Sequence, residues 1–134
     1  MARDIIRTGD APSSSIFSQA VRAGGLIFVS GQAPIDPATG RISGETIQEQ
    51  TRQSLTNVQT ILAAAGSGLD KIVSATVILV EESDFAGMNE EWARWFPTDP
   101  PARQGARHPF DAEGFRVSLA AIAELQSSSD TPTD

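Results

Sequence analysis

The sequence contains no cysteine and no tyrosine, and it has a single histidine, His108. The absence of cysteine excludes a disulfide framework, a thiolate metal site and a cysteine nucleophile. A single histidine excludes a histidine-rich metal site and makes a serine–histidine–aspartate triad hard to build. The chain therefore has few residues for metal-based or nucleophilic catalysis.

Positive charge is also scarce, because 10 lysine and arginine residues stand against 17 aspartate and glutamate residues, giving a formal net charge of −7. A protein that binds nucleic acid normally carries a basic face that neutralises phosphates. Here the basic residues are scattered singly until Arg103, Arg107 and Arg116. We therefore expect neither nucleic acid nor an anionic membrane surface as a partner.

Long hydrophobic runs are missing as well. Runs such as Leu26 to Val29 are far below the roughly 18 residues that a membrane span requires. The N-terminal residues lack the apolar segment of a signal peptide, which favours a cytoplasmic location. The 134 residues suit one domain. We expect this domain over residues 1–125 and a disordered polar tail over residues 126–134.

Turn and capping signals divide the first half of the chain into elements. The glycine pair at residues 24–25 lies between two short apolar runs, which predicts a β-hairpin. The proline-rich stretch 33–40 predicts a rigid surface loop. Thr46 and Glu49 fit a capping box at the start of an amphipathic helix. Gly66 supplies the left-handed residue that ends this helix.

The second half alternates in the same way between strand and helix patterns. Residues 72–80 are nearly all apolar or β-branched, which predicts a strand buried on both faces. Ser83 or Asp84 is expected to cap a second helix, which Pro97 ends. Gly87 inside this helix indicates that something packs closely there. Further strands are expected over residues 101–107 and 115–123.

The predicted fold is α+β, in the order β-β-α-β-α-β-β, with one mixed sheet and two helices on one face. Simple alternation assigns the two faces of the strand over residues 72–80: Val73, Ala75, Val77 and Leu79 on one, and Ile72, Ser74, Thr76, Ile78 and Val80 on the other. The second face is small or apolar, unlike a solvated sheet face. Another subunit is its simplest cover, so we expect an obligate oligomer.

Several short motifs occur together along the chain. They are Ser18-Gln19-Ala20-Val21, Phe28-Val29-Ser30-Gly31-Gln32, Asp36-Pro37-Ala38-Thr39-Gly40, Gln50-Thr51-Arg52-Gln53, Ala64-Ala65-Gly66, Asp84-Phe85 with Asn89, and Pro101-Ala102-Arg103. Jointly they resemble the Rid family (YjgF/RidA/endoribonuclease L-PSP-like), over about residues 5–124. The resemblance implies a chorismate-mutase-like fold and a homotrimer with a central β-barrel and ligand clefts between subunits.

The resemblance also implies an activity: hydrolysis of enamine or imine acids, as by 2-iminobutanoate/2-iminopropanoate deaminases, to 2-keto acids and ammonia without a metal or organic cofactor. Arg103 matches the family arginine that binds the carboxylate of this small substrate, and a planar guanidinium suits that role. The alternative is a surface or interface ion-pair residue. Gly31 matches a glycine whose backbone lines the cleft, or it only shapes the strand end. Asn89 either hydrogen-bonds near the cleft or is an exposed helix amide.

The chain departs from the family pattern at three positions. Phe17 stands where the family has a tyrosine, Ser118 where it has a glutamate, and Gly105 where it has a cysteine. Phe17 can stack on a ligand but cannot donate a hydrogen bond. Ser118 can orient water but cannot act as a general base near pH 7. We therefore expect Arg103 and Ser118 to be the catalytic residues of a divergent member whose reaction is weakened or shifted in substrate.

A second arginine lies close to the first in sequence. Arg103, Gly105 and Arg107 would share one face of an extended segment. Two guanidiniums in one cleft would favour a dicarboxylate or a larger acidic ligand. The simpler alternative is that Arg107 and His108 are solvated at a strand end.

Two other functions compete with the deaminase. The first is a non-catalytic protein of the same fold that binds carboxylate metabolites. The second is the ribonuclease or translation-inhibitor activity of some relatives, which the net charge of −7 opposes.

Overall fold

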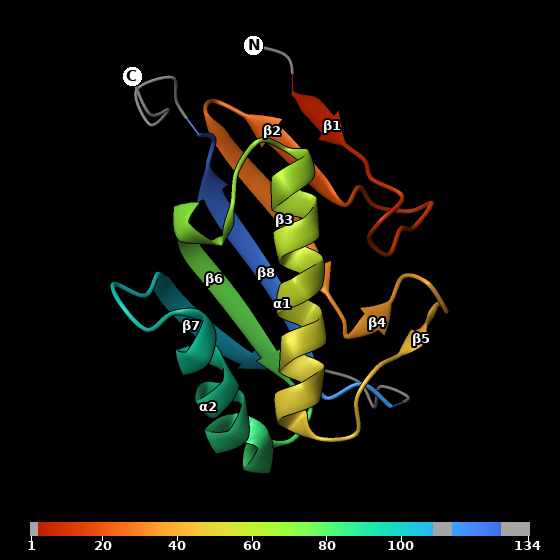
Figure 1. The fold of residues 1–134 in the computed structure, drawn as a ribbon, viewed down its shortest axis with the longest axis vertical. Coiled ribbons are helices and arrows are strands. Elements are labelled where there is room, and N and C mark those ends of the chain that lie inside the picture. The colour runs from red at the N-terminus through yellow and green to blue at the C-terminus, as the bar shows by residue number, and fades with distance from the viewer. Residues whose placement is uncertain (1–2, 109–113, 127–134) are drawn as a thin grey trace.

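Residues 3–108 and 114–126 are described by the computed structural model, in which one six-stranded sheet carries both helices on the same face (Figure 1). The helices are α1 (Ile47–Ala64) and α2 (Phe85–Trp95). The strands of this sheet are β1 (Asp4–Ile6), β2 (Ala20–Ala23), β3 (Leu26–Gln32), β6 (Ile72–Leu79), β7 (Ala102–Arg107) and β8 (Val117–Glu124). Their order is β1-β2-β3-β8-β6-β7. The predicted tail lies outside the described residues, apart from Gln126.

Pairing within this sheet confirms that it is mixed. β6 and β7 run parallel, whereas the other neighbouring strands run antiparallel. The predicted order of elements corresponds to β2, β3, α1, β6, α2, β7 and β8. The α+β prediction is therefore confirmed, and one short strand, β1, adds to the edge beyond β2.

The stretch expected to be a loop contains a small second sheet. β4 (Ile35–Asp36) and β5 (Arg41–Ile42) pair antiparallel around a turn that Gly40 completes with a φ of 72°. The loop prediction for residues 33–40 was therefore wrong at Ile35 and Asp36. A strand of two residues is too short for its alternation to be visible in a sequence.

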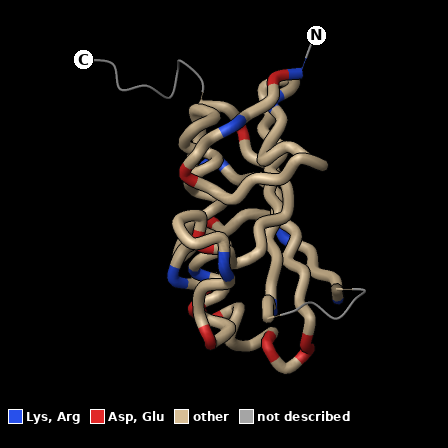
Figure 2. Tube along the Cα trace, turned by 90° about the vertical axis from the view of Figure 1, so that its right-hand side faces the viewer, with Lys and Arg blue, Asp and Glu red and all other residues tan. Residues whose placement is uncertain are grey.

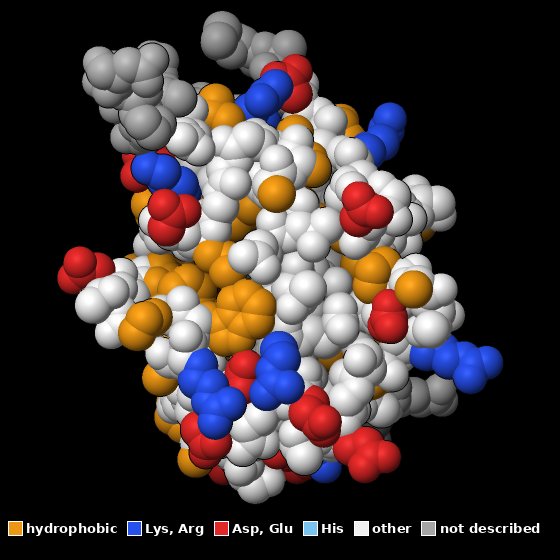
Figure 3. Space-filling model, in the orientation of Figure 1, with side chains coloured by type: hydrophobic (Ala, Val, Ile, Leu, Met, Phe, Trp, Pro, Cys, Tyr) orange, Lys and Arg blue, Asp and Glu red, His pale blue; other side chains and the backbone are white. Residues whose placement is uncertain are grey.

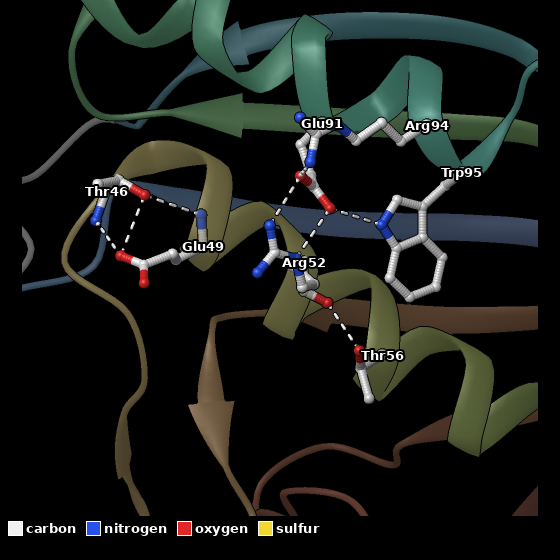
Figure 4. A network of polar contacts seen from close by, with 7 residues as sticks. All are labelled: Thr46, Glu49, Arg52, Thr56, Glu91, Arg94 and Trp95. Atoms are coloured by element: carbon white, nitrogen blue, oxygen red, sulfur yellow. Dashed lines mark hydrogen bonds and ion pairs between the residues drawn. The ribbon is translucent and has the colours of Figure 1, made fainter.

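Three local signals formed as predicted. Gly24 and Gly25 adopt φ values of 59° and 80°, which the hairpin between β2 and β3 requires. At the start of α1, the Thr46 hydroxyl accepts from the Glu49 N–H at 3.1 Å, and the Glu49 carboxylate accepts from the Thr46 N–H at 3.0 Å (Figure 4). Gly66, just beyond α1, has a φ of 80°. The capping box and the left-handed stop are both confirmed.

The start of α2 differs in part from the prediction. Asp84 occupies the N-cap position, but its side chain makes no capping hydrogen bond, because a 3₁₀ turn over Glu82–Asp84 leads directly into the helix. The close packing expected at Gly87 is confirmed. A Cβ atom there would lie 2.5 Å from Cγ2 of Ile47, the first residue of α1. Only a glycine allows the two helices to approach this closely.

A β-bulge changes the faces of β6 at its first residues. The register with β8 shifts between Ile72 and Ser74, so Ile72 is buried in the core while Val73 is 41% exposed. Simple alternation places Val73 on the core face with Ala75 and Val77, and Ile72 on the other face. The structure shows the reverse, so this assignment of Ile72 and Val73 was wrong. A bulge inserts one extra residue into a strand and moves every side chain before it to the other face.

The hydrophobic core lies between the sheet and the helices. Its members include Ala75 and Val77 of β6, Val117 and Leu119 of β8, Leu55, Val58, Ile61 and Leu62 of α1, and Met88 and Trp92 of α2. Both described helices lie on one face of the sheet, and no described helix covers the opposite face (Figure 1). It carries half-buried residues without charge, Thr76, Ile78, Ser118, Ala120 and Ile122, with Phe28 42% exposed beside them.

Charges of both signs are interspersed over the molecule. Figure 2 shows Lys and Arg positions dispersed among Asp and Glu positions along the trace. On the face that carries the helices, acidic and basic side chains alternate around a group of hydrophobic ones (Figure 3). In the part of the chain that the structure describes, no helix is long and apolar enough to cross a membrane.

Candidate functional site

A pocket of about 630 Å³ lies between the helix-side face of β6–β7 and the helix α2. Its lining residues are Val77 and Leu79 of β6, Glu82, Phe85 and Met88 at and near the start of α2, and Arg103, Gln104, Gly105, Ala106 and Arg107 of β7. The parallel register places Arg103, Gly105 and Arg107 opposite Ala75, Val77 and Leu79. The three β7 residues therefore share one face, as the sequence predicts.

Arg103 lies against α2. Its Nη1 atom donates to Sδ of Met88 at 3.8 Å, and its guanidinium carbon is 5.1 Å from the centre of the Trp92 ring and 5.9 Å from that of Phe85. These contacts orient the cation but leave most of its N–H donors without a strong acceptor. None of the ion pairs between described residues includes Arg103. As far as the described residues are concerned, Arg103 is therefore available to bind an anion.

The rest of β7 extends the pocket away from Arg103. Gly105 leaves bare backbone between the two arginines, and a Cβ atom there would lie 3.4 Å from the Val77 carbonyl oxygen. Arg107 ends the strand and lines the same pocket. His108 follows it, with its N–H donating to the Leu79 carbonyl at 2.8 Å and its ring edge-on to Phe115 at 5.2 Å.

Gly31 and Ser118 are direct neighbours at the other predicted part of the site. A Cβ atom on Gly31 would lie 2.9 Å from Oγ of Ser118, so a side chain at position 31 would displace the Ser118 hydroxyl. Phe17 is carried by a segment attached to the same strand, because the Ser30 hydroxyl donates to the Ser18 carbonyl at 2.6 Å. The Phe17 ring is 52% exposed. We call Phe17, Gly31 and Ser118 the β3 group.

Ser118 and its neighbour Gly31 lie on the other side of the sheet from Arg103 in one chain. Ser118 is paired with Ile78, and Ile78 with Ala106, in the set of residues that faces away from the helices. Arg103 belongs to the helix-side set. One chain therefore does not bring the two predicted catalytic residues, Arg103 and Ser118, to the same substrate.

Asn89 is placed differently from both interpretations of the sequence. It is partly buried on α2 rather than fully exposed, and its Oδ1 atom is buried without a hydrogen-bond partner among the described residues. It is absent from the lining of the pocket that contains Arg103. No three His, Asp or Glu side chains within residues 3–108 and 114–126 come together in a way that could hold a metal ion.

Known proteins match this chain over nearly its whole length. The family model described as endoribonuclease L-PSP matches residues 8–125. A RutC family protein of Pyrococcus horikoshii is 45% identical over 122 residues, covering 90% of this chain and 97% of that protein. The chain belongs to the Rid family.

Further relatives indicate the fold and one activity within the family. The 2-iminobutanoate/2-iminopropanoate deaminase of Capra hircus is 37% identical over 124 residues, covering 92% of this chain and 90% of that protein. The crystal structure of YyfA, a Rid family protein of Yersinia pestis, has a TM-score of 0.87 at 35% identity, covering 92% of this chain and all of that one. The family predicted from the sequence and the α+β fold, one mixed sheet with two helices, are thus confirmed.

In this Rid family chain a buried ion pair fixes the helix that forms one wall of the pocket. Glu91 of α2 has a side chain only 3% exposed, and it accepts from Nε and Nη2 of Arg52 on α1 at 3.1 and 3.2 Å (Figure 4). Nε1 of Trp95 donates to the same carboxylate at 2.9 Å. The hydrogen bonds from Arg52, followed by that from Trp95, lower the pKa of Glu91, although burial acts in the opposite direction.

Sequence reasoning missed a second polar contact that shapes the Rid fold near the site. The buried Gln50 donates from Nε2 to the carbonyls of Gly44 and Gly114 at 3.2 and 3.0 Å. Its Oε1 atom accepts from the Arg116 N–H at 2.7 Å. Gln50 thus holds the start of β8 against α1, just before Ser118. A glutamine inside the apolar stripe of a helix was the available signal, because a buried amide needs partners.

We predict that Glu91→Gln destabilises the protein by about 1–3 kcal/mol at pH 7, because a charged hydrogen-bonded pair is lost from a buried site whose Arg52 partner is half exposed. The folded-state pKa of Glu91 is lowered, so its stabilisation is present above the unfolded pKa of about 4.3. It is lost as the pH falls through the folded pKa. The difference between wild type and variant should therefore shrink from pH 7 to pH 3.

Urea unfolding at a fixed protein concentration measures this difference. Arg94→Gln is the matched control, because Arg94 lies 3.9 Å from the same carboxylate but is 65% exposed, and its loss should cost less than about 0.5 kcal/mol. An Arg94 variant as unstable as the Glu91 variant would contradict the role given to the Arg52 pair.

Proposed function

We propose that this protein hydrolyses an enamine or imine acid to a 2-keto acid and ammonia without a metal or organic cofactor. The observation that carries the proposal is Arg103, a cation without a carboxylate partner in the described chain, at the wall of a largely apolar pocket. The deaminase of Capra hircus, 37% identical, supports the same reaction class. Phe17 and Ser118 weaken this reaction or shift its substrate, because both lack the polar group of the family residue.

The reaction requires little from the protein beyond binding and orientation. Arg103 holds the substrate carboxylate through two parallel hydrogen bonds. A water oxygen then forms a bond to the imine carbon while its proton passes to the nitrogen. The hydroxyl proton of the resulting carbinolamine passes to the amine nitrogen as the carbonyl forms, and the C–N bond breaks to release ammonia. Ser118 orients the water, since a serine hydroxyl near pH 7 is not a general base.

The active protein is a homotrimer in this proposal. Arg103 and Ser118 lie on different sides of the sheet in one chain, so a shared substrate needs the pocket of one copy against the β3 group of the next. Head-to-tail contacts of that kind close into a ring when the rotation permits. The uncharged open face of the sheet, with Phe28 and Ile122, would be covered in the ring. We further propose a cytoplasmic location, which fractionation of cells that produce the full chain would test.

A non-catalytic function is the second candidate. Ser118 and Phe17 remove the two polar groups by which family members act on water, whereas Arg103 and the apolar pocket wall still suit a carboxylate ligand. The protein would then bind 2-keto acids or similar metabolites and release them unchanged. Turnover of an imine generated in the assay separates this candidate from the deaminase.

We predict that Arg103→Ala abolishes imine hydrolysis and weakens binding of 2-oxobutanoate ten- to hundredfold, because a charge-assisted bidentate contact is worth about 1.5–3 kcal/mol. Arg103→Lys should recover only part of the binding, since an ammonium cannot make two parallel hydrogen bonds. Calorimetry gives both affinities, and circular dichroism confirms the fold. Arg41→Gln, which removes an exposed arginine of β5, is the control for net charge. Unchanged affinity in the Arg103 variants would refute the assignment.

We predict a trimer in solution at micromolar concentration, with Ile78→Lys giving monomers because it places a charge on the open face of the sheet. Gln59→Lys, an exposed position on α1, is the matched control and should remain trimeric. Sedimentation velocity distinguishes the species. A stable wild-type monomer would leave Arg103 and Ser118 apart and remove the shared cleft.

We predict that Ser118→Glu raises the turnover of 2-aminoacrylate, since general base catalysis contributes on the order of 10²–10⁴-fold. Gly31 has no side chain to obstruct the longer residue. Ser118→Gln is the matched control, with the same size and no base, and should not gain activity. Phe17→Tyr in the same chain tests whether both polar groups must surround one water. A wild type as fast as glutamate-bearing relatives would contradict the role given to Ser118.

A further inference from the structure

We propose that the pocket selects substrates with two carboxylates, an imino or enamino dicarboxylic acid, and that Arg107 binds the second one. This inference rests on the proposed function, because it takes Arg103 as the site of the first carboxylate. It adds a residue that determines specificity and a substrate class that differs from monocarboxylic imines.

The spacing of the two arginines matches a short dicarboxylate. Arg103 and Arg107 lie four residues apart on the same face of β7, which places their Cα atoms about 13 Å apart at roughly 3.3 Å per residue. A bidentate pair sets a carboxylate carbon about 4 Å from its guanidinium carbon. The terminal carbons of an extended five-carbon diacid are about 5 Å apart, given C–C bonds of about 1.5 Å. The distance of about 13 Å, less about 4 Å at each end, leaves about 5 Å, so such a diacid fits between two guanidiniums that keep the spacing of their Cα atoms.

The surface between the arginines leaves room for that ligand. Gly105, midway along the strand face, offers only backbone, and the neighbouring floor of Val77 and Leu79 is apolar. The pocket volume of about 630 Å³ is well above what a three- or four-carbon imino acid occupies, since sites of this size hold drug-sized ligands. The chain connecting two carboxylates can lie across this floor without meeting a side chain from position 105.

The charges of the pocket favour a dianion. Glu82 is the single carboxylate among its described lining residues, against two guanidiniums. None of the ion pairs between described residues includes Glu82, Arg103 or Arg107, so neither arginine has a carboxylate partner within residues 3–108 and 114–126. In a protein with a net charge of −7, this local positive excess attracts a doubly negative ligand to the pocket in particular.

Calorimetry with two stable 2-keto acids tests the proposal. The probes are 2-oxoglutarate, which has two carboxylates, and 2-oxobutanoate, which has one, each at low and at physiological salt. The wild type should prefer the diacid. Arg107→Gln should weaken 2-oxoglutarate binding about 5- to 20-fold and change 2-oxobutanoate binding less than twofold, because an exposed charge-assisted contact is partly screened. Arg41→Gln carries the same change of net charge at an exposed site outside the pocket, and should leave both affinities unchanged.

The outcomes separate this inference from the proposed function. If Arg103→Ala loses both acids while Arg107→Gln alters neither, the carboxylate site stands and the dicarboxylate inference is overturned. Equal weakening of both acids by Arg107→Gln, or a wild type with no preference for the diacid, also overturns it. If Arg103→Ala binds both acids as the wild type does, the proposed function itself fails. Arg107→Lys should retain part of the preference, since it keeps the charge but loses the bidentate geometry.

Discussion

The parallel pairing of β7 with β6 is the constraint on which the pocket depends. Parallel register sets Arg103, Gly105 and Arg107 on the helix-side face, directly opposite core residues of β6. Two parallel strands need a crossover connection, and here that connection contains α2. The same chain segment that permits the pairing therefore also supplies the opposite wall of the pocket, through Phe85 and Met88. The arginine cation, the apolar floor and the apolar wall of the pocket are therefore all placed by the crossover from β6 through α2 to β7.

The position of α2 depends in turn on its contacts with α1. Gly87 allows the start of α1 to approach within a distance that any side chain would prevent, and Glu91 binds Arg52 one turn further along. The first contact is steric and the second is electrostatic, and both lie on the side of α2 that faces α1. Trp92, which contacts Arg103, comes directly after Glu91. The orientation of the guanidinium is therefore linked to an ion pair that never touches the ligand.

Sequence patterns predicted the features whose cause is local. The capping box of Thr46, the glycine turn at residues 24–25 and the shared face of the β7 residues all depend on near neighbours in the chain. One error arose where a distant contact decides, because the bulge at Ile72–Ser74 follows from the register of β6 with β8. The missing cap at Asp84 has a local cause, the 3₁₀ turn directly before α2. Motif matching also grouped Arg103 with Ser118, which only the sheet topology separates.

The edge position of β7 has a consequence for local stability. Among the described strands, β7 pairs with β6 alone, and every residue of β7 is exposed in the single chain. The core strands β3, β8 and β6 can therefore stay packed under α1 while β7 detaches, at a free-energy cost below that of global unfolding. Such a partial opening removes both arginines from the pocket at once. A ligand that contacts both Arg103 and the α2 wall of the pocket would make this opening less frequent. Ligand binding would therefore slow amide hydrogen exchange in β7 more than in the other strands.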